Sequence, residues 1–277
     1  MKGLLQRAIT AVIFVAVMLG GLFFSKESFL ALFGLVTLMS LWEFYGLTIK
    51  KDTNSSIRKI YGVILGMIPY IMGVYYHLDG IENSFLFLQK CMLIFLPLLF
   101  LAFIVELFLA ADQPFSNLGQ IFLGIIYISI PFTLLQFIAI EGGNFYPTII
   151  LGMLLLTWAT DTGAYVIGSL IGKNKLFPRI SPNKTWEGSL GGVVVTFLIA
   201  WLLSIYITEL QLKDWLVLAG LVAIFASIGD LVESMLKRSL GVKDSGTIMP
   251  GHGGFLDRFD AFMFLIPFAS AYLLWLR

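Results

Sequence analysis

The chain has 277 residues, of which 58% are hydrophobic and 13% are charged, and its formal net charge is +1. A soluble protein carries about 25% charged residues, so this composition excludes an ordinary soluble domain and is typical of a polytopic membrane protein. The small net charge argues against a nucleic-acid partner, which requires a basic patch. One cysteine and two histidines exclude an internal disulfide and a histidine metal cluster.

Nine apolar segments are long enough to cross about 30 Å of hydrocarbon as helices, which takes about 20 residues each. Because the bilayer core holds no water, and because no segment alternates like a barrel strand, these spans must be α-helical. The sequence therefore predicts an all-α polytopic membrane protein with about nine transmembrane helices. We place them at residues 8–24, 29–47, 60–77, 88–110, 119–140, 147–171, 189–208, 215–236 and 259–276.

The polar residues concentrate in the second half of the chain. We predict one integral membrane domain over residues 1–277, with N-terminal helices in 1–146 and a catalytic half in 147–277. Nine spans put the termini on opposite sides, and the side of the N-terminus holds fourteen of the eighteen Lys and Arg residues. By the positive-inside rule, the N-terminus and the polar loops of the catalytic half face the cytoplasm of a plasma or inner membrane.

Several acidic residues lie inside predicted spans, where charge is costly. Asp161 lies about 18 Å along its helix from Lys173, near the middle of the bilayer. Small neighbours also fit close helix packing, but we favour a functional Asp161 because an unpaired buried carboxylate loses several kcal/mol or takes up a proton. Glu43 and Glu106 lie about one turn inside their helices, and both a functional role and pairing with a loop lysine stay open.

The eighth span ends with a polar face. Asp230, Glu233, Ser234 and Lys237 fall within roughly 100° of one another on a helix. A stripe of this kind on a soluble helix is an ordinary ion-paired surface, whereas at a membrane interface it is typical of a helix that lines an aqueous pocket.

Two loops on the predicted cytoplasmic side carry further candidates. In 237–258, glycines suit the close approach of backbone amides to phosphate, and Asp257 and Asp260 begin a helix with the carboxylates that Mg²⁺ prefers. Asp257 alone also fits a helix cap. In 172–188, Lys184 and Glu187 lie at a helix N-terminus, which is typical of an anion site or an ordinary cap.

The run from Ser234 to Asp260 resembles the signature of the phosphatidate cytidylyltransferase (CDP-diacylglycerol synthase) family. Two shorter stretches, Asp161–Tyr165 and Ser181–Gly188, resemble the family as well, so the likeness covers about the last 120 residues. The signature positions are Ser234, Lys237-Arg238, Lys243-Asp244, His252-Gly253-Gly254, Asp257-Arg258 and Asp260.

The resemblance implies transfer of CMP from CTP to phosphatidic acid, giving CDP-diacylglycerol and pyrophosphate, with Mg²⁺ required and one or two cations bound. It also implies dimers in the membrane, which the sequence neither supports nor opposes. The leading metal ligands are then Asp230, Asp257 and Asp260, with Asp161 and Asp244 behind them. The residues expected to bind phosphates or complete the pocket are Lys184, Glu187, Lys237, Arg238, Lys243, His252, Gly253, Gly254 and Arg258.

Other classes fit less well. The chain lacks the Asp-x-x-Asp-Gly-x-x-Ala-Arg run typical of CDP-alcohol phosphotransferases and the Asn-Asp-x-x-Asp run of polyprenyl-transferring enzymes. The alternative from another class is a secondary transporter that uses intramembrane acidic residues as cation sites. Transporters usually have two similar halves, whereas here the polar residues gather in one half.

Overall fold

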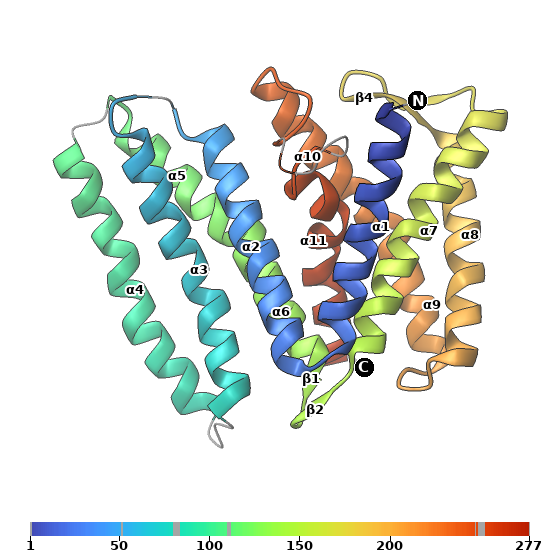
Figure 1. Ribbon diagram of the computed structural model, residues 1–277, viewed down its shortest axis with the longest axis horizontal. Coiled ribbons are helices and arrows are strands. Elements are labelled where there is room, and N and C mark those ends of the chain that lie inside the picture. The colour runs from blue at the N-terminus through green and yellow to red at the C-terminus, as the bar shows by residue number, and fades with distance from the viewer. Residues whose placement is uncertain are drawn as a thin grey trace. The chain divides into compact units, whose positions relative to one another are not determined.

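The computed structural model describes residues 2–50, 52–79, 84–109, 112–246, 248 and 253–276. In this part of the chain, eight helical stretches are long and apolar enough to cross a membrane, and a shorter apolar stretch, Ile9–Phe23, precedes them. The predicted all-α polytopic membrane fold is thereby confirmed (Figure 1).

The helices follow the predicted segments in order. They are α1 (Lys2–Phe23), α2 (Lys26–Thr48), α3 (Ser55–Asp79), α4 (Ser84–Leu109), α5 (Pro114–Gly124), α6 (Ile130–Ala139), α7 (Pro147–Ile171), α8 (Trp186–Tyr206), α9 (Leu212–Leu221), α10 (Ser227–Ser239) and α11 (Leu256–Ala271). One π-helical turn joins α5 to α6 (Ile125–Ser129), another joins α9 to α10 (Val222–Ala226), and a third follows α11 (Tyr272–Leu276). Each joined pair therefore makes one span.

Two short hairpins were not predicted. Strands β1 (Ile140–Glu141) and β2 (Asn144–Phe145) pair antiparallel, as do β3 (Lys175–Phe177) and β4 (Ser181–Thr185). Such short strands have no sequence pattern of their own, because cross-strand partners stabilise them. The second hairpin ends at Thr185, whose hydroxyl accepts a hydrogen bond from the Gly188 amide at 3.2 Å and caps the N-terminus of α8.

The chain divides into two compact units. The first contains the described residues of 1–136 and 245–256, and the second those of 137–244 and 257–277. A single segment, 245–256, thus joins the N-terminal helices although it lies in the second half of the sequence. The predicted organisation, one membrane domain whose catalytic half is 147–277, stays a prediction.

The first unit has a buried polar core among its helices. The Arg58 guanidinium donates to Glu106 at 2.9 Å, and the Tyr61 hydroxyl donates to the same carboxylate at 2.6 Å. Arg58 and Glu106 are only 0% and 2% exposed. Glu106 is therefore ion-paired. Pairing was one of the two interpretations that the sequence left open, but the partner is an arginine of a helix instead of a loop lysine.

In the second unit, α7 and α8 run side by side (Figure 1). A Cβ atom on Gly192 would lie 2.7 Å from the carbonyl oxygen of Thr160, so only glycine permits this approach of the two backbones. The hydroxyls of Thr160 and Thr196 form a hydrogen bond of 2.6 Å between the helices. The close packing against α8 therefore holds the part of α7 next to Asp161 in place.

Candidate active site

A polar pocket lies within the second unit and has a volume of about 460 Å³. Three of the predicted residues, Asp161 of α7, Lys184 of β4 and Asp230 of α10, line it together. Asn183 and Tyr165 add polar groups to its wall. Residues about seventy positions apart in the sequence thus share one cavity, and both signs of charge face into it.

Lys184 and Asp230 form an ion pair at 2.5 Å across this pocket. The Lys184 ammonium also donates to the carbonyl oxygen of Ser227 at 3.3 Å. The side chains of Lys184 and Asp230 keep 26% and 35% of their surface exposed. Because an ion pair with this much exposure is weak, either partner can turn to a ligand in the pocket at small cost.

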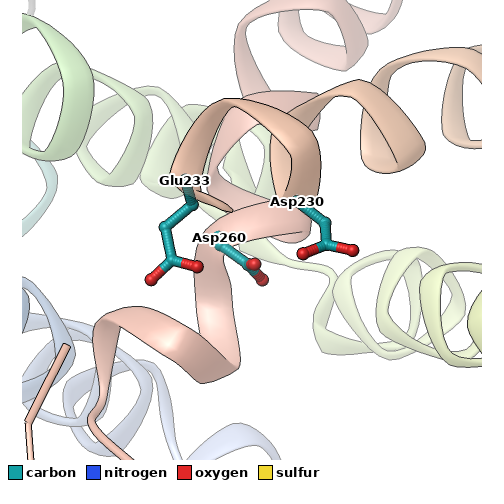
Figure 2. A group of neighbouring side chains, drawn as sticks. All are labelled: Asp230, Glu233 and Asp260. Atoms are coloured by element: carbon teal, nitrogen blue, oxygen red, sulfur yellow. The ribbon is translucent and has the colours of Figure 1, made fainter. Parts of the chain in front are cut away.

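Asp230 also belongs to a group of three carboxylates with Glu233 and Asp260. Each offers one oxygen atom, and these oxygens all lie within 4.8 Å of one another. Figure 2 shows the three carboxylates gathered at the contact of α10 and α11, with Asp260 between the other two in this view. Asp230 and Glu233 share a face of α10, as predicted from their spacing, and Asp260 enters from the first turns of α11.

These carboxylates fit a divalent cation. Mg²⁺ binds oxygen at 2.0–2.1 Å in octahedral geometry, so its ligands lie at most about 4 Å apart, and the three oxygens here lie within 4.8 Å of one another. Glu233 is fully buried, and its Oε1 atom has no hydrogen-bond partner among the described residues. A buried carboxylate oxygen needs a cation or donor nearby, and a metal ion held by the group would supply one.

The Lys237 side chain places a positive charge next to these carboxylates. The Lys237 ammonium forms an ion pair with Glu233 and another, at 2.6 Å, with Asp257. The side chains of Lys237 and Asp257 are 12% and 6% exposed. Lys237 therefore holds the last turn of α10 to the first turn of α11, and the Asp257 carboxylate faces a lysine instead of joining the group of three.

Glu187 supports the hairpin that carries Lys184. Its carboxylate accepts hydrogen bonds from the Lys173 amide at 3.1 Å, the Asn174 amide at 3.2 Å and the Asn174 side chain at 2.7 Å. These bonds tie the start of α8 to the end of α7. Glu187 thus shapes the wall of the pocket and is not one of the residues that line it.

The remaining predicted residues lie elsewhere. Lys243, Asp244, Arg238 and Arg258 are exposed, and Arg238 donates to the Val242 carbonyl at 3.2 Å. Asp244 does not join the three carboxylates. Gly253 and Gly254 belong to the first unit, and His252 lies outside the described residues.

Glu233 is the member of this group that the sequence interpretation left out of the candidate metal ligands. It was placed on the polar face of its helix with Asp230 and Lys237, so the signal was present in the i, i+3 spacing. Its burial is what distinguishes it, and burial depends on α11, which is distant in sequence. The assignment of all these residues to catalysis, nucleotide binding or metal binding stays a prediction.

Comparisons with known proteins give matches that cover nearly the full length of this chain. The family model described as "Cytidylyltransferase family" matches residues 5–276. A protein named phosphatidate cytidylyltransferase from Staphylococcus haemolyticus is 34% identical over 273 residues, covering 97% of this chain and 98% of that protein. One of the same name from Staphylococcus saprophyticus is 36% identical over 276 residues, with 98% and 97% covered. Another from Staphylococcus aureus (strain COL) is 41% identical over 162 residues, or 58% of this chain and 60% of that protein.

Proposed function

The chain belongs to the cytidylyltransferase family, and on that premise we propose that it transfers CMP from CTP to phosphatidic acid. The products are CDP-diacylglycerol and pyrophosphate, and the reaction requires Mg²⁺. The family that the signature residues predicted is confirmed, and the chain is a nucleotidyltransferase. The substrates and the metal are the parts that we propose.

One observation carries the proposal. A group of three carboxylates adjoins two lysines and an open polar pocket, all within a bundle of membrane helices. A metal and a water-soluble polyphosphate need such charges, whereas a lipid alone does not. The helices around the site provide the apolar surroundings in which a phospholipid acceptor can approach it.

The chemistry is a displacement at phosphorus. A phosphate oxygen of the lipid forms a bond to the α-phosphorus of CTP, while the bond from that phosphorus to the oxygen bridging the β-phosphate breaks and pyrophosphate leaves. The lipid phosphate is already ionised near neutral pH, since the second pKa of a phosphate monoester is about 6. No strong base is therefore needed, and we assign none.

The protein's own groups then position and neutralise the reactants. Lys184, at the pocket, binds phosphate oxygens in exchange for Asp230. Arg238, Lys243 and Arg258 are exposed and available to the polyphosphate, arginine by a bidentate contact. When bound to the three carboxylates, Mg²⁺ supplies charge neutralisation and orientation of the transferring phosphoryl group.

An assay with purified protein tests this proposal. Radiolabelled CTP, phosphatidic acid and Mg²⁺ are expected to give labelled lipid only when all three are present, and a chelator of divalent cations is expected to remove at least about 99% of the product, which added Mg²⁺ restores. Product that persists with the chelator would contradict the metal proposal. Solute flux across proteoliposomes without any lipid product would favour the secondary transporter instead.

We further propose that the site faces the cytoplasm. The support is the excess of Lys and Arg on the side of the N-terminus, fourteen of eighteen. In a Cys91→Ser background, a single cysteine at the exposed position Lys243 is expected to react with a membrane-impermeant maleimide only after the membrane is opened, whereas one at Lys213 reacts in intact cells. The reverse pattern would overturn the orientation.

A further inference from the structure

Glu43 of α2 is a buried carboxylate that the proposed chemistry does not use. It is 5% exposed and lies about one turn before the end of an apolar helix. It accepts hydrogen bonds from described residues of the segment 245–256 of the same unit: the Ser245 hydroxyl donates at 3.1 Å, the Phe255 amide at 3.0 Å and the Leu256 amide at 2.9 Å. One carboxylate thus binds the beginning and the end of a segment of twelve residues.

The packing around this carboxylate is tight. A Cβ atom on Gly246 would lie 2.5 Å from a Glu43 oxygen, and one on Gly254 would clash with the same carboxylate. A side chain at either position would therefore displace the carboxylate or the backbone beside it. Hydrogen bonds to a buried charge are stronger than those between neutral groups, and two of the three donors here are backbone amides that have no rotamer to lose.

The contact lies at the start of α11. Leu256 is the first residue of α11, and its amide is one of the four at a helix N-terminus that have no partner within the helix. Glu43 accepts from it, which satisfies the amide and places a negative charge at the positive end of the helix. Asp257 and Asp260 follow within the next turn, so their positions depend on how α11 starts.

We propose that Glu43 is a positioning residue for cytidylyl transfer. It accepts hydrogen bonds from Ser245 and from the first amide of α11, the helix that also carries Asp260. This inference rests on the proposed function for its effect on turnover, but the anchoring itself is a property of the folded chain. Glu43 touches no reacting atom and is not a catalytic residue.

The test is Glu43→Gln, which keeps the shape but replaces one acceptor oxygen by a donor. Amide hydrogen exchange in the detergent-solubilised protein is expected to become about tenfold faster at Phe255 and Leu256, the loss expected for a charge-assisted hydrogen bond. The Mg²⁺ concentration at half-maximal activity is expected to rise about tenfold, since Asp260 is less well placed. The matched control is Glu106→Gln, a buried carboxylate of the same unit that contacts Arg58.

The control separates a local effect at Glu43 from a general loss of stability. Glu106→Gln is expected to lower the melting temperature but to leave hydrogen exchange at Leu256 and the Mg²⁺ dependence unchanged. In that case, a general loss of stability does not explain the changes expected for Glu43→Gln. Unchanged exchange in Glu43→Gln overturns the anchor, and faster exchange with wild-type Mg²⁺ dependence overturns the positioning role.

A second variant covers the case in which Glu43→Gln does not fold. Gly246→Ala keeps the carboxylate and displaces the segment from it, so it is expected to raise exchange and the Mg²⁺ requirement in the same direction. If the wild-type protein makes no CDP-diacylglycerol, the proposed function fails while the exchange measurement still decides the anchor.

Discussion

Replacing Asp260 by asparagine is expected to lower cytidylyl transfer by at least about a thousandfold, while the protein still inserts into the membrane and keeps its melting temperature. The amide has nearly the shape of the carboxylate but not its charge, so the group with Asp230 and Glu233 loses one of its three anionic ligands. The measurement is the initial rate of labelled lipid formation at saturating CTP and Mg²⁺. Removing a carboxylate from three that lie within 4.8 Å also relieves repulsion, so no loss of stability is expected.

The control for this variant is Asp112→Asn. The Asp112 side chain is 91% exposed and lies in the first unit, 3.9 Å from the Lys50 ammonium. This variant is expected to retain the wild-type rate. If Asp260→Asn were as active as Asp112→Asn, the three carboxylates would not be the metal site.

Replacing Lys237 by methionine is expected to destabilise the protein and abolish turnover together. Lys237 is the cation between Glu233 and Asp257, and all three side chains are 12% exposed or less. Removing one partner leaves the others as buried charges, which costs about 3–5 kcal/mol when a buried ion pair is broken. A fall in melting temperature of several degrees, measured by thermal unfolding in detergent, and loss of labelled lipid are the expected results.

Two further variants test whether the effect of Lys237→Met comes from the loss of its charge beside buried carboxylates. Lys50→Met, at a lysine whose side chain is 65% exposed, is expected to change neither quantity. Adding Glu233→Gln to Lys237→Met removes one of the uncompensated charges and is expected to restore part of the melting temperature, although not the activity. A Lys237→Met protein with the wild-type melting temperature would show that these buried charges do not need the lysine.

The membrane spans could be predicted closely because they depend on the hydropathy and length of continuous segments of the sequence. The predicted helix 147–171 coincides with α7, where Pro147 occupies the first turn and Gly172 follows the last residue. The predicted start at residue 29 is three residues late for α2. The Ser25 hydroxyl accepts from the Ser28 amide at 3.1 Å, so the helix begins at Lys26, among polar residues that hydropathy excludes.

The composition of the site could be predicted only in part. Asp161, Lys184 and Asp230 were all candidates, and the structure brings them to one pocket. Lys237 binds both Asp257, at 2.6 Å, and Glu233, and Glu233 also belongs to the group of three carboxylates, so a metal-ligand role for Asp257 stays a prediction. Which carboxylate faces a lysine and which faces another carboxylate depends on side-chain directions that spacing along one helix does not reveal.

The residue order alone was enough to establish a helical membrane protein and its family, since both depend on properties that neighbouring residues in the chain carry: apolar length, helical spacing and a run of signature residues. The folded chain had to show that carboxylates of α10 and α11 converge, and that Glu43 of α2 binds a segment about two hundred positions later. These contacts join parts of the chain that share no local pattern. They depend on helix packing, which is a property of the whole set of contacting side chains and of no single segment.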